Sequence, residues 1–544
     1  MEKIDRPAMR GRGKGRDFGK MTDKQFAQMG ATGKKGSQAD ELVVLGEDLV
    51  LFHDQSCEGF AFLKGESIPL RSKRIKQYLA KCMWEAYRIA PSTGTLNQAI
   101  NILEAKALYD NPQVPLFNRV GKRGDGDDSF YYDLGNGKVV RVTPQGWAIG
   151  DAPILFRHYS HQRSQVTPIR GGDPWTLFEF INVEFEHRPL ILVYLITCFI
   201  PNISHPIIHP YGDQGAGKTT ACMMIKDIID PSILKTQSIP KDLKELIQTL
   251  AHHYFPVFDN VSSLPDWVSN VLCQACTGGG LSKRQLYTDD EDMIYQFKRC
   301  IGLNGINVVV HKPDLMDRSI LFPLERIHKE KRKKEAELWA EFESFKPSML
   351  GGIFDTLSKA MTIYPAVHLP WTPRMADFGT WGFSIAEALG KGMGEKFLEA
   401  YRKTIDRQNE EVVQTNALAQ SVLSFMEDKD DWEGMIGEAW DHLYKIVDEP
   451  KKDPTFPKGQ RTLRKHLANI RPNLQYYGIF YKIYPRTKDG YPIIFTRNRE
   501  KLDSFGSSSE FANQIKGIGG ERNGEANEAK SPLFQVGNPV ADEF

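Results

Sequence analysis

Three absences narrow the classes to which this protein can belong. Its longest apolar run, at 189–200, has about a dozen residues, whereas a membrane-spanning helix needs ~20, so we expect a buried helix there and no membrane partner. The seven cysteines are scattered without a framework, which indicates a reducing interior and a cytoplasmic protein. The net charge of +1 gives no general attraction to nucleic acid, so such contacts must come from local patches.

One pair of cysteines, Cys273 and Cys276, has the CxxC spacing that zinc sites use. No second pair of ligands stands at a suitable spacing. We therefore favour two core cysteines on one helix face, with metal binding as the alternative.

The pattern of apolar residues changes along the chain. The runs 41–52 and 130–149 alternate and turn like strands, and 71–90 and 95–108 have helical periodicity. Residues 205–323 alternate short apolar runs with helical stretches, which predicts a mainly parallel sheet covered by helices. Residues 330–410 are almost wholly helical in pattern. Both ends are poor in apolar residues and are expected to be disordered; the basic first 40 residues form either a solubilising tail or a nucleic-acid arm.

A glycine-rich stretch between an apolar run and a helical run fits the pattern GxxxxGK[ST]. Glycines allow the backbone to approach a phosphate, and consecutive N–H groups at a helix N-terminus face the anion. Lys218 would bridge the β- and γ-phosphates of ATP, and Thr219 would ligate Mg²⁺. The candidate nucleotide-binding residues are Gly212, Asp213, Gln214, Gly215, Ala216, Gly217, Lys218, Thr219 and Thr220.

A second Mg²⁺ ligand is expected at the end of a neighbouring strand. The run 254–258 is short and apolar and is followed by Asp259, which is either this ligand or a strand-end cap. Asn260 comes next, where many ATPases carry a glutamate that activates water. An amide cannot take a proton at neutral pH, so Asn260 could orient the water while another carboxylate acts as the base.

Two polar residues at later strands are further catalytic candidates. Asn304 ends a third apolar run, where its amide could sense the γ-phosphate. Arg318 precedes a fourth run and is either a surface residue or an arginine finger for a neighbouring subunit. No NKxD-type guanine reader is found, which disfavours a GTPase.

These stretches together resemble the superfamily three helicases of viruses and plasmids, within the AAA+ class, and a group of phage and mobile-element ATPases found beside primase-polymerases. The resemblance rests on 212–220, 254–260, 300–305 and 314–322, and on 259–293 and 373–382. It implies a sheet of order 5-1-4-3-2, a ring that is usually a hexamer, ATP between subunits, and a primase-polymerase as a possible partner. It also implies a second-sensor role for Arg374.

In superfamily three, a basic hairpin between the aspartate strand and the sensor strand tracks DNA. The corresponding segment here makes Lys283 and Arg284 candidates, with a solvated loop as the alternative. Independently, a basic helical run followed by two strands and a basic turn outlines a winged helix. Its DNA-binding or partner-binding face would carry Lys458, Arg461, Arg464, Lys465 and His466, with Arg486 and Lys488 in the turn.

We therefore expect an α/β protein with a P-loop AAA+ core that acts as an ATP- and Mg²⁺-dependent, ring-forming DNA helicase of a mobile element. The alternatives are a DNA loader or remodeller, or an ATP-switched initiator scaffold. The expected segments are a basic tail (1–40), an α+β accessory domain (41–175), the ATPase core (176–330), a helical lid (331–410), a winged-helix-like domain (411–500) and a tail (501–544).

Overall fold

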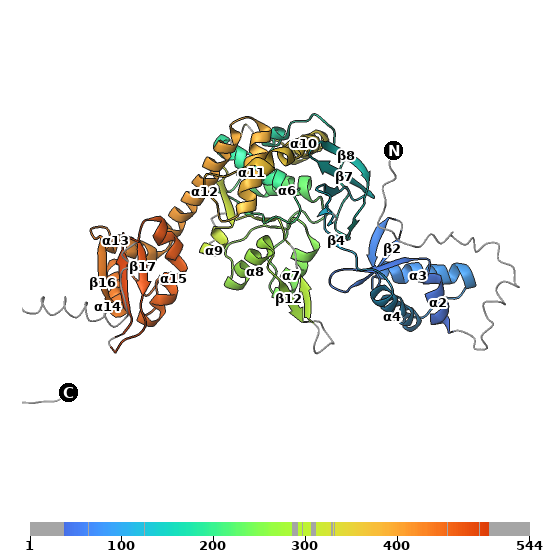
Figure 1. Ribbon diagram of the computed structural model, residues 1–544, viewed down its shortest axis with the longest axis horizontal. Helices are drawn as coiled ribbons and strands as arrows, with labels where there is room; N and C mark the ends of the chain where they lie inside the picture. Colours follow the sequence, from blue (N-terminus) through green and yellow to red (C-terminus); the bar gives the residue numbers. More distant parts are fainter. Residues whose placement is uncertain are drawn as a thin grey trace, which may run out of the picture. The chain divides into compact units, whose positions relative to one another are not determined.

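The computed structural model describes residues 37–499, except 64, 125, 285–291, 296–297, 306–311, 328–329, 331, 454, 489. The chain divides into two compact units after Ile405. Figure 1 shows the elements coloured along the sequence. Both expected tails lie mostly outside the described residues. None of the described helices has the length and apolar character to cross a bilayer.

The first part of unit 1 is a small α+β domain with its own apolar core. It contains α2 (Gln38–Gly46), β1 (Val50–His53), β2 (Gly59–Leu63), β3 (Glu66–Pro69), α3 (Lys73–Tyr87) and α4 (Thr93–Tyr109), and the strands form an antiparallel sheet in the order β1-β2-β3. The prediction of a strand over 41–52 is wrong in its first half. Ser37 and Asp40 form a capping box there, and the chain begins the helix α2.

A second antiparallel sheet follows, with strands in the order β5-β6-β7-β8. Its strands are β5 (Val120–Lys122), β6 (Phe130–Asp133), β7 (Lys138–Thr143) and β8 (Gly146–Asp151), flanked by the parallel pair β4 (Leu116–Phe117) and β9 (Leu155–Phe156). The expected turn lies between β6 and β7, where Gly135 and Gly137 have φ of 73° and 82°. Tyr132, Val140 and Trp147 belong to the main core of unit 1, so this sheet packs with the central domain.

The central sheet has four parallel strands in the order β11-β14-β10-β15. They are β10 (Ile207–Tyr211), β11 (Val257–Phe258), β14 (Ile301–Leu303) and β15 (Ser319–Pro323). Gln237 adds a single parallel bridge to Phe258 on β11. The expected parallel sheet is thus present with four strands, and the five-stranded order stays an interpretation.

Helices connect and cover these strands. They are α5 (Arg188–Thr197), α6 (Lys218–Ile229), α7 (Leu243–His252), α8 (Asp266–Thr277) and the short α9 (Pro313–Met316), preceded by the 3-10 turns η2 (Pro174–Glu179) and η3 (Phe185–His187). Eight residues of α5 are buried, which confirms the expected buried helix. The hairpin of β12 (Leu281–Arg284) and β13 (Asp292–Tyr295) stands between α8 and β14.

The expected helical region contains α10 (Glu335–Ile363), η5 (Tyr364–Ala366), α11 (Ala376–Leu389) and α12 (Met393–Thr415). The segment before α5 packs against α10 without room for side chains. A Cβ on Gly351 would lie 1.6 Å from the carbonyl oxygen of Ile169, and one on Gly172 would lie 1.9 Å from that of Ser348. The glycines at both contacts therefore permit this close backbone approach.

Unit 2 has a separate apolar core and a three-stranded antiparallel sheet of order β16-β18-β17. Its elements are α13 (Ala417–Phe425), β16 (Asp431–Met435), α14 (Ile436–Ile446), α15 (Gln460–Tyr476), β17 (Phe480–Ile483) and β18 (Pro492–Thr496). The expected helix and two following strands are present. Lys458 was expected on the helix and instead precedes it, because Gly459 is the N-cap residue of α15.

Candidate nucleotide site and DNA-contacting surfaces

The glycine-rich loop leads directly from β10 into α6, as its sequence context predicts. Gly217 caps the helix in the left-handed region with φ of 80°, so α6 begins at Lys218. Gly212 has φ of 135°, and a Cβ there would lie 2.4 Å from the carbonyl oxygen of Leu324 on the β15 side. Only glycine fits this position, and the loop is held open around the helix N-terminus.

Lys218 lies at this loop and contacts only its backbone. Its ammonium group donates to the carbonyl oxygens of Gly212 at 2.7 Å and Asp213 at 2.8 Å. No carboxylate is bonded to it among the described residues. The lysine is therefore held beside the loop by neutral acceptors that an anionic ligand can replace.

Thr219, Asp259 and Asn304 meet at the carboxyl ends of three neighbouring parallel strands. Asp259 follows β11, Asn304 follows β14, and Thr219 lies in the first turn of α6, the helix after β10. The Thr219 hydroxyl donates to the Asp259 carboxylate at 3.3 Å, and the Asn304 amide donates to the Thr219 hydroxyl at 2.8 Å and also to the same carboxylate. Parallel strands end at one edge of a sheet, where ligands bind in such folds. The structure thus brings together three candidate residues, of which Thr219 and Asn304 are 85 residues apart in the sequence.

Asn304 is buried, with 3% of its surface exposed, and its Oδ1 has no hydrogen-bond partner among the described residues. A buried polar atom without a partner is uncommon and points to an absent ligand or water. Hydroxyl, carboxylate and amide oxygens are also the hard donors that Mg²⁺ prefers. The donor set at this edge therefore fits the ion that the sequence predicts.

Asn260 stands at the rim of the cluster rather than inside it. It is exposed, its φ is 54°, and its N–H donates to the Asp259 carboxylate at 2.8 Å. Asparagine is among the few non-glycine residues that adopt this left-handed conformation readily. Its main observed contact is therefore a backbone one that holds Asp259.

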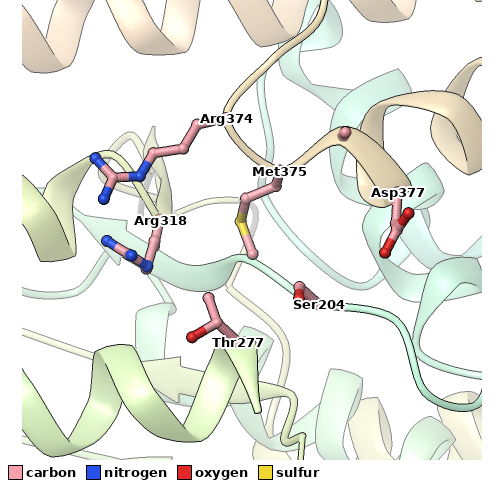
Figure 2. A pocket seen from close by; sticks show the side chains of 7 residues that line it. Ser204, Thr277, Arg318, Arg374, Met375 and Asp377 are labelled. Atoms are coloured by element: carbon pink, nitrogen blue, oxygen red, sulfur yellow. The ribbon is translucent and has the colours of Figure 1, made fainter. Parts of the chain in front are cut away.

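Arg318 and Arg374 lie together at a separate pocket of about 270 Å³. Figure 2 shows both guanidinium groups on one side of it, with Arg374 from the segment before α11 and Arg318 from the turn before β15. None of the nucleotide-loop residues is among its lining residues, which are Ser204, Thr277, Arg318, Arg374, Met375, Ala376 and Asp377. The structure thus does not bring either arginine to the loop of its own chain.

Both arginines are held by carboxylates. Asp314 accepts from Arg318 and from Arg374, and Asp317 accepts from Arg374 at 2.6 Å. Burial opposes ionisation of Asp314, but its hydrogen bond to Arg318 and the charge of that arginine leave its pKa below the usual value. Burial raises the pKa of Asp317. The pocket thus contains two oriented cations, whose partners are the exposed Asp314 and the partly buried Asp317.

Sequence reasoning missed Arg332, which lies in the charged run before α10. Its guanidinium nitrogen would be 3.5 Å from a Cβ built on Gly215, and its Nε donates to the carbonyl oxygen of Ile327 at 3.3 Å. Ile327 in turn donates its N–H to the Gly215 carbonyl at 3.4 Å. These contacts are tertiary, and the residue pattern of the run gave no signal for them.

The CxxC cysteines are buried on α8, and the Cys276 thiol donates to the Cys273 carbonyl at 3.3 Å. This arrangement fits two core cysteines. Among the described residues, the three-member groups with metal-ligand spacing lie elsewhere, at Cys198, His205 and Cys300 and at Glu184, Glu186 and His187.

The candidate DNA residues lie on two surfaces. Lys283 and Arg284 are on β12, paired with Met293 and Asp292 of β13, so they stand on a hairpin as the resemblance implies. Asp292 ends the acidic run 289–292, whose other three residues lie outside the described ones. In unit 2, Arg461, Arg464 and Lys465 of α15 line a pocket of about 720 Å³ together with residues of the β17–β18 region. Arg486 and Lys488 are exposed in the turn between those strands.

The fold and this loop define a mixed α/β protein with a parallel central sheet and a phosphate-loop sequence at its central helix. Residues 175–411 match the family described as "Actinomycete integrative conjugative element replication protein", and residues 418–505 match the C-terminal domain of its RepA. The two segments are thus similar to mobile-element replication proteins, and neither match alone spans half of the chain.

Solved structures show weaker similarity. "SCCmec type IV Cch - active helicase" is 11% identical, with a TM-score of 0.43, and the match covers 82% of this chain and 93% of that one. The NrS-1 C-terminal region is also 11% identical, with a TM-score of 0.38 and coverage of 85% and 100%. TM-scores below 0.5 carry no argument about function. No curated protein shows significant similarity to the sequence.

Proposed function

We propose that the protein is an ATPase that assembles as a ring, holds ATP between neighbouring subunits, and uses hydrolysis to translocate on and unwind DNA during replication of a mobile element. The observation that carries this proposal is the separation of two half-sites. Lys218, Thr219, Asp259 and Asn304 form one, and Arg318 with Arg374 forms the other. Neither half holds all the groups that phosphoryl transfer uses.

In the first half-site, the N–H groups of 212–217 and the N-terminus of α6 would bind the phosphates. Lys218 would exchange the carbonyls of Gly212 and Asp213 for the β- and γ-phosphates. Thr219 and Asp259 would hold Mg²⁺, which neutralises phosphate charge when bound. The free Oδ1 of Asn304 would orient the attacking water, while Asn260 at the rim cannot act as a base.

The second half-site would receive the γ-phosphate of the neighbouring subunit. A cavity of about 270 Å³ lies just below the ~300–1,000 Å³ of sites that enclose whole small-molecule ligands, so it suits a phosphate group better than a whole nucleotide. Arg318 and Arg374 would leave Asp314 and Asp317 for the more highly charged phosphate. Both arginines would thus act on the neighbour, whereas the sequence had suggested a sensor role for Arg374.

Support for the AAA+ interpretation comes from the sheet. In the order 5-1-4-3-2, the strands 5, 1, 4 and 3 correspond to β15, β10, β14 and β11. The bridge of Gln237 to β11 stands where strand 2 would lie. The hairpin with Lys283 and Arg284 and the basic face of unit 2 with Lys458, Arg461, Arg464 and Lys465 would contact DNA phosphates, which give affinity without sequence preference.

A second candidate function is an initiator scaffold in which ATP sets the oligomeric state. The amide at Asn260, where a catalytic acid is common, favours it. Strand displacement on a forked DNA substrate separates the two functions, with particle size measured with and without ATP. We expect ATP-dependent displacement and a ring-sized particle. Hydrolysis stimulated by single strands without displacement would instead support the scaffold or a loader.

A further inference from the structure

The basic face of unit 2 forms one wall of a groove. The groove has a volume of about 720 Å³ and lies between α15 and the β17–β18 region. Its walls contribute cations from α15 and tyrosines from the strands and the turn. The lining includes Arg461, Arg464, Lys465, Arg471, Tyr481 and Tyr491.

The charge of this groove is entirely of one sign. Four cations line it and no acidic residue does. In the part of the chain that the structure describes, none of these four cations forms an ion pair, although exposed lysines and arginines elsewhere on the chain do. Concentrated positive charge without counter-charges attracts a polyanion.

Two of the arginines lie over tyrosine rings. The Arg464 guanidinium lies 4.2 Å from the ring centre of Tyr491, and that of Arg471 lies 4.8 Å from the ring centre of Tyr481. Arg471 also donates to the Tyr481 carbonyl oxygen at 3.1 Å. Both arginines are exposed and line the groove, so each tyrosine positions a planar cation at its wall.

This arrangement does not suit a recognition helix in a duplex. Such a helix presents extended side chains to base edges in the major groove, whereas Arg464 and Arg471 lie over tyrosines of the β17–β18 region. Planar guanidinium groups are surfaces on which unpaired bases stack.

We propose that this groove binds single-stranded DNA, with unpaired bases stacked on Arg464 and Arg471 and phosphates bound by Arg461 and Lys465. The inference rests on the proposed function, because it specifies the form of DNA that unit 2 holds. The sequence suggested a winged helix that binds DNA or a partner through the same residues, and the inference specifies a single strand as its ligand.

The decisive variant is Arg464→Lys in the full-length protein, because lysine keeps the charge and loses the plane. It is made in a Lys283→Ala/Arg284→Ala background, so that the hairpin does not mask the effect. Fluorescence anisotropy without ATP is measured with a labelled single strand, a duplex of the same sequence and a single-stranded RNA. Loss of base stacking is expected to weaken single-strand binding about tenfold and to leave duplex binding nearly unchanged.

The matched control is Arg486→Gln/Lys488→Gln, which removes two charges from the turn. We expect it to leave the preference for single strands intact. Equal loss of single-strand and duplex binding in Arg464→Lys, or a larger loss from the turn variant, would overturn the inference. Competition by ATP or dAMP at concentrations that match the strand would assign the groove to mononucleotides instead.

A second measurement does not depend on variants that fold. A single strand with 2-aminopurine at successive positions is titrated with the unsubstituted protein, and we expect the fluorescence to change at the positions where a base leaves its neighbours and stacks on Arg464 or Arg471. No change at any position at saturation would refute stacking. Failure of the protein to bind any DNA would refute the proposed function, whereas binding without single-strand preference would refute this inference alone.

Discussion

The two ends of α6 carry lysines with opposite surroundings. Lys218, at the first position, bonds only to neutral loop carbonyls. Lys226, two turns later, is 2% exposed and donates to the Phe255 carbonyl at 2.7 Å and to Asp230 at 3.4 Å. The same residue type on one helix thus belongs to the proposed nucleotide site at one end and to the buried core at the other.

The buried end is a complete network. Arg119, between β4 and β5, donates to Asp230 at 3.1 Å, and Asp230 also accepts from the N–H groups of Tyr254 and Phe255. Burial alone would raise the pKa of Asp230, but Lys226 and Arg119 together hold it below its usual value. Its polar partners are therefore supplied from within the fold, in contrast to the free Asn304 oxygen at the other end.

The largest expected effect is on ATP hydrolysis, at the Lys218 end of α6. Lys218→Ala should reduce phosphate release to the background of the assay, because the β- and γ-phosphates lose their cation. Its melting temperature should stay close to that of the unsubstituted protein, since Lys218 has no buried partner. Full ATPase activity in this variant would end the distinction between the two lysines.

Arg318→Ala should lower hydrolysis by about 10³-fold or more, as loss of an arginine finger does, while nucleotide binding by fluorescence titration persists. Mixing it with Lys218→Ala subunits should restore part of the activity, because some interfaces then combine an intact loop with an intact arginine. No rescue, with subunit mixing verified by a tagged pull-down, would place both half-sites in one subunit.

At the buried Lys226 end of α6, Arg119→Met should lower the free energy of unfolding by about 3–5 kcal/mol, because it leaves the buried Asp230 without one of its cations. Thermal or urea denaturation measures this loss. The matched control is Arg71→Met, which breaks an exposed pair with Glu104 at 2.7 Å and should cost ~0–1 kcal/mol. Equal effects of the two substitutions would show that burial does not set the difference.

The smallest effect is expected from pH. Burial lowers the pKa of His253, which stacks on His161 beside Lys226 and Asp230, from 6.5 to about 3. The unfolded chain therefore binds a proton between these values that the folded one does not, so stability is lost as pH falls through this window. His253→Gln should flatten the pH dependence of the melting temperature between pH 6.5 and 4. An unchanged slope would exclude His253 as its source.

The sequence predicted best what local patterns specify. The apolar runs before Asp259 and Asn304 end at one sheet edge, so their meeting with Thr219 followed from strand order. The helix at 38–46 was misread because its apolar residues were weighed above the Ser37–Asp40 cap. The pairing of Arg318 with Arg374 depends on how the segment before α11 packs on the turn before β15. The position of Arg464 over the Tyr491 ring likewise depends on tertiary packing, which residue patterns do not contain.

The backbone at Asn260 restricts which residues evolution can place there. With φ of 54°, this position favours glycine, asparagine or aspartate, and a longer acidic side chain would add about 1–2 kcal/mol of conformational strain. A single-base route from asparagine to aspartate keeps the turn and adds a carboxylate, whereas glutamate needs a rebuilt turn as well. This backbone conformation therefore accommodates an aspartate at this position with less strain than the glutamate that many ATPases carry.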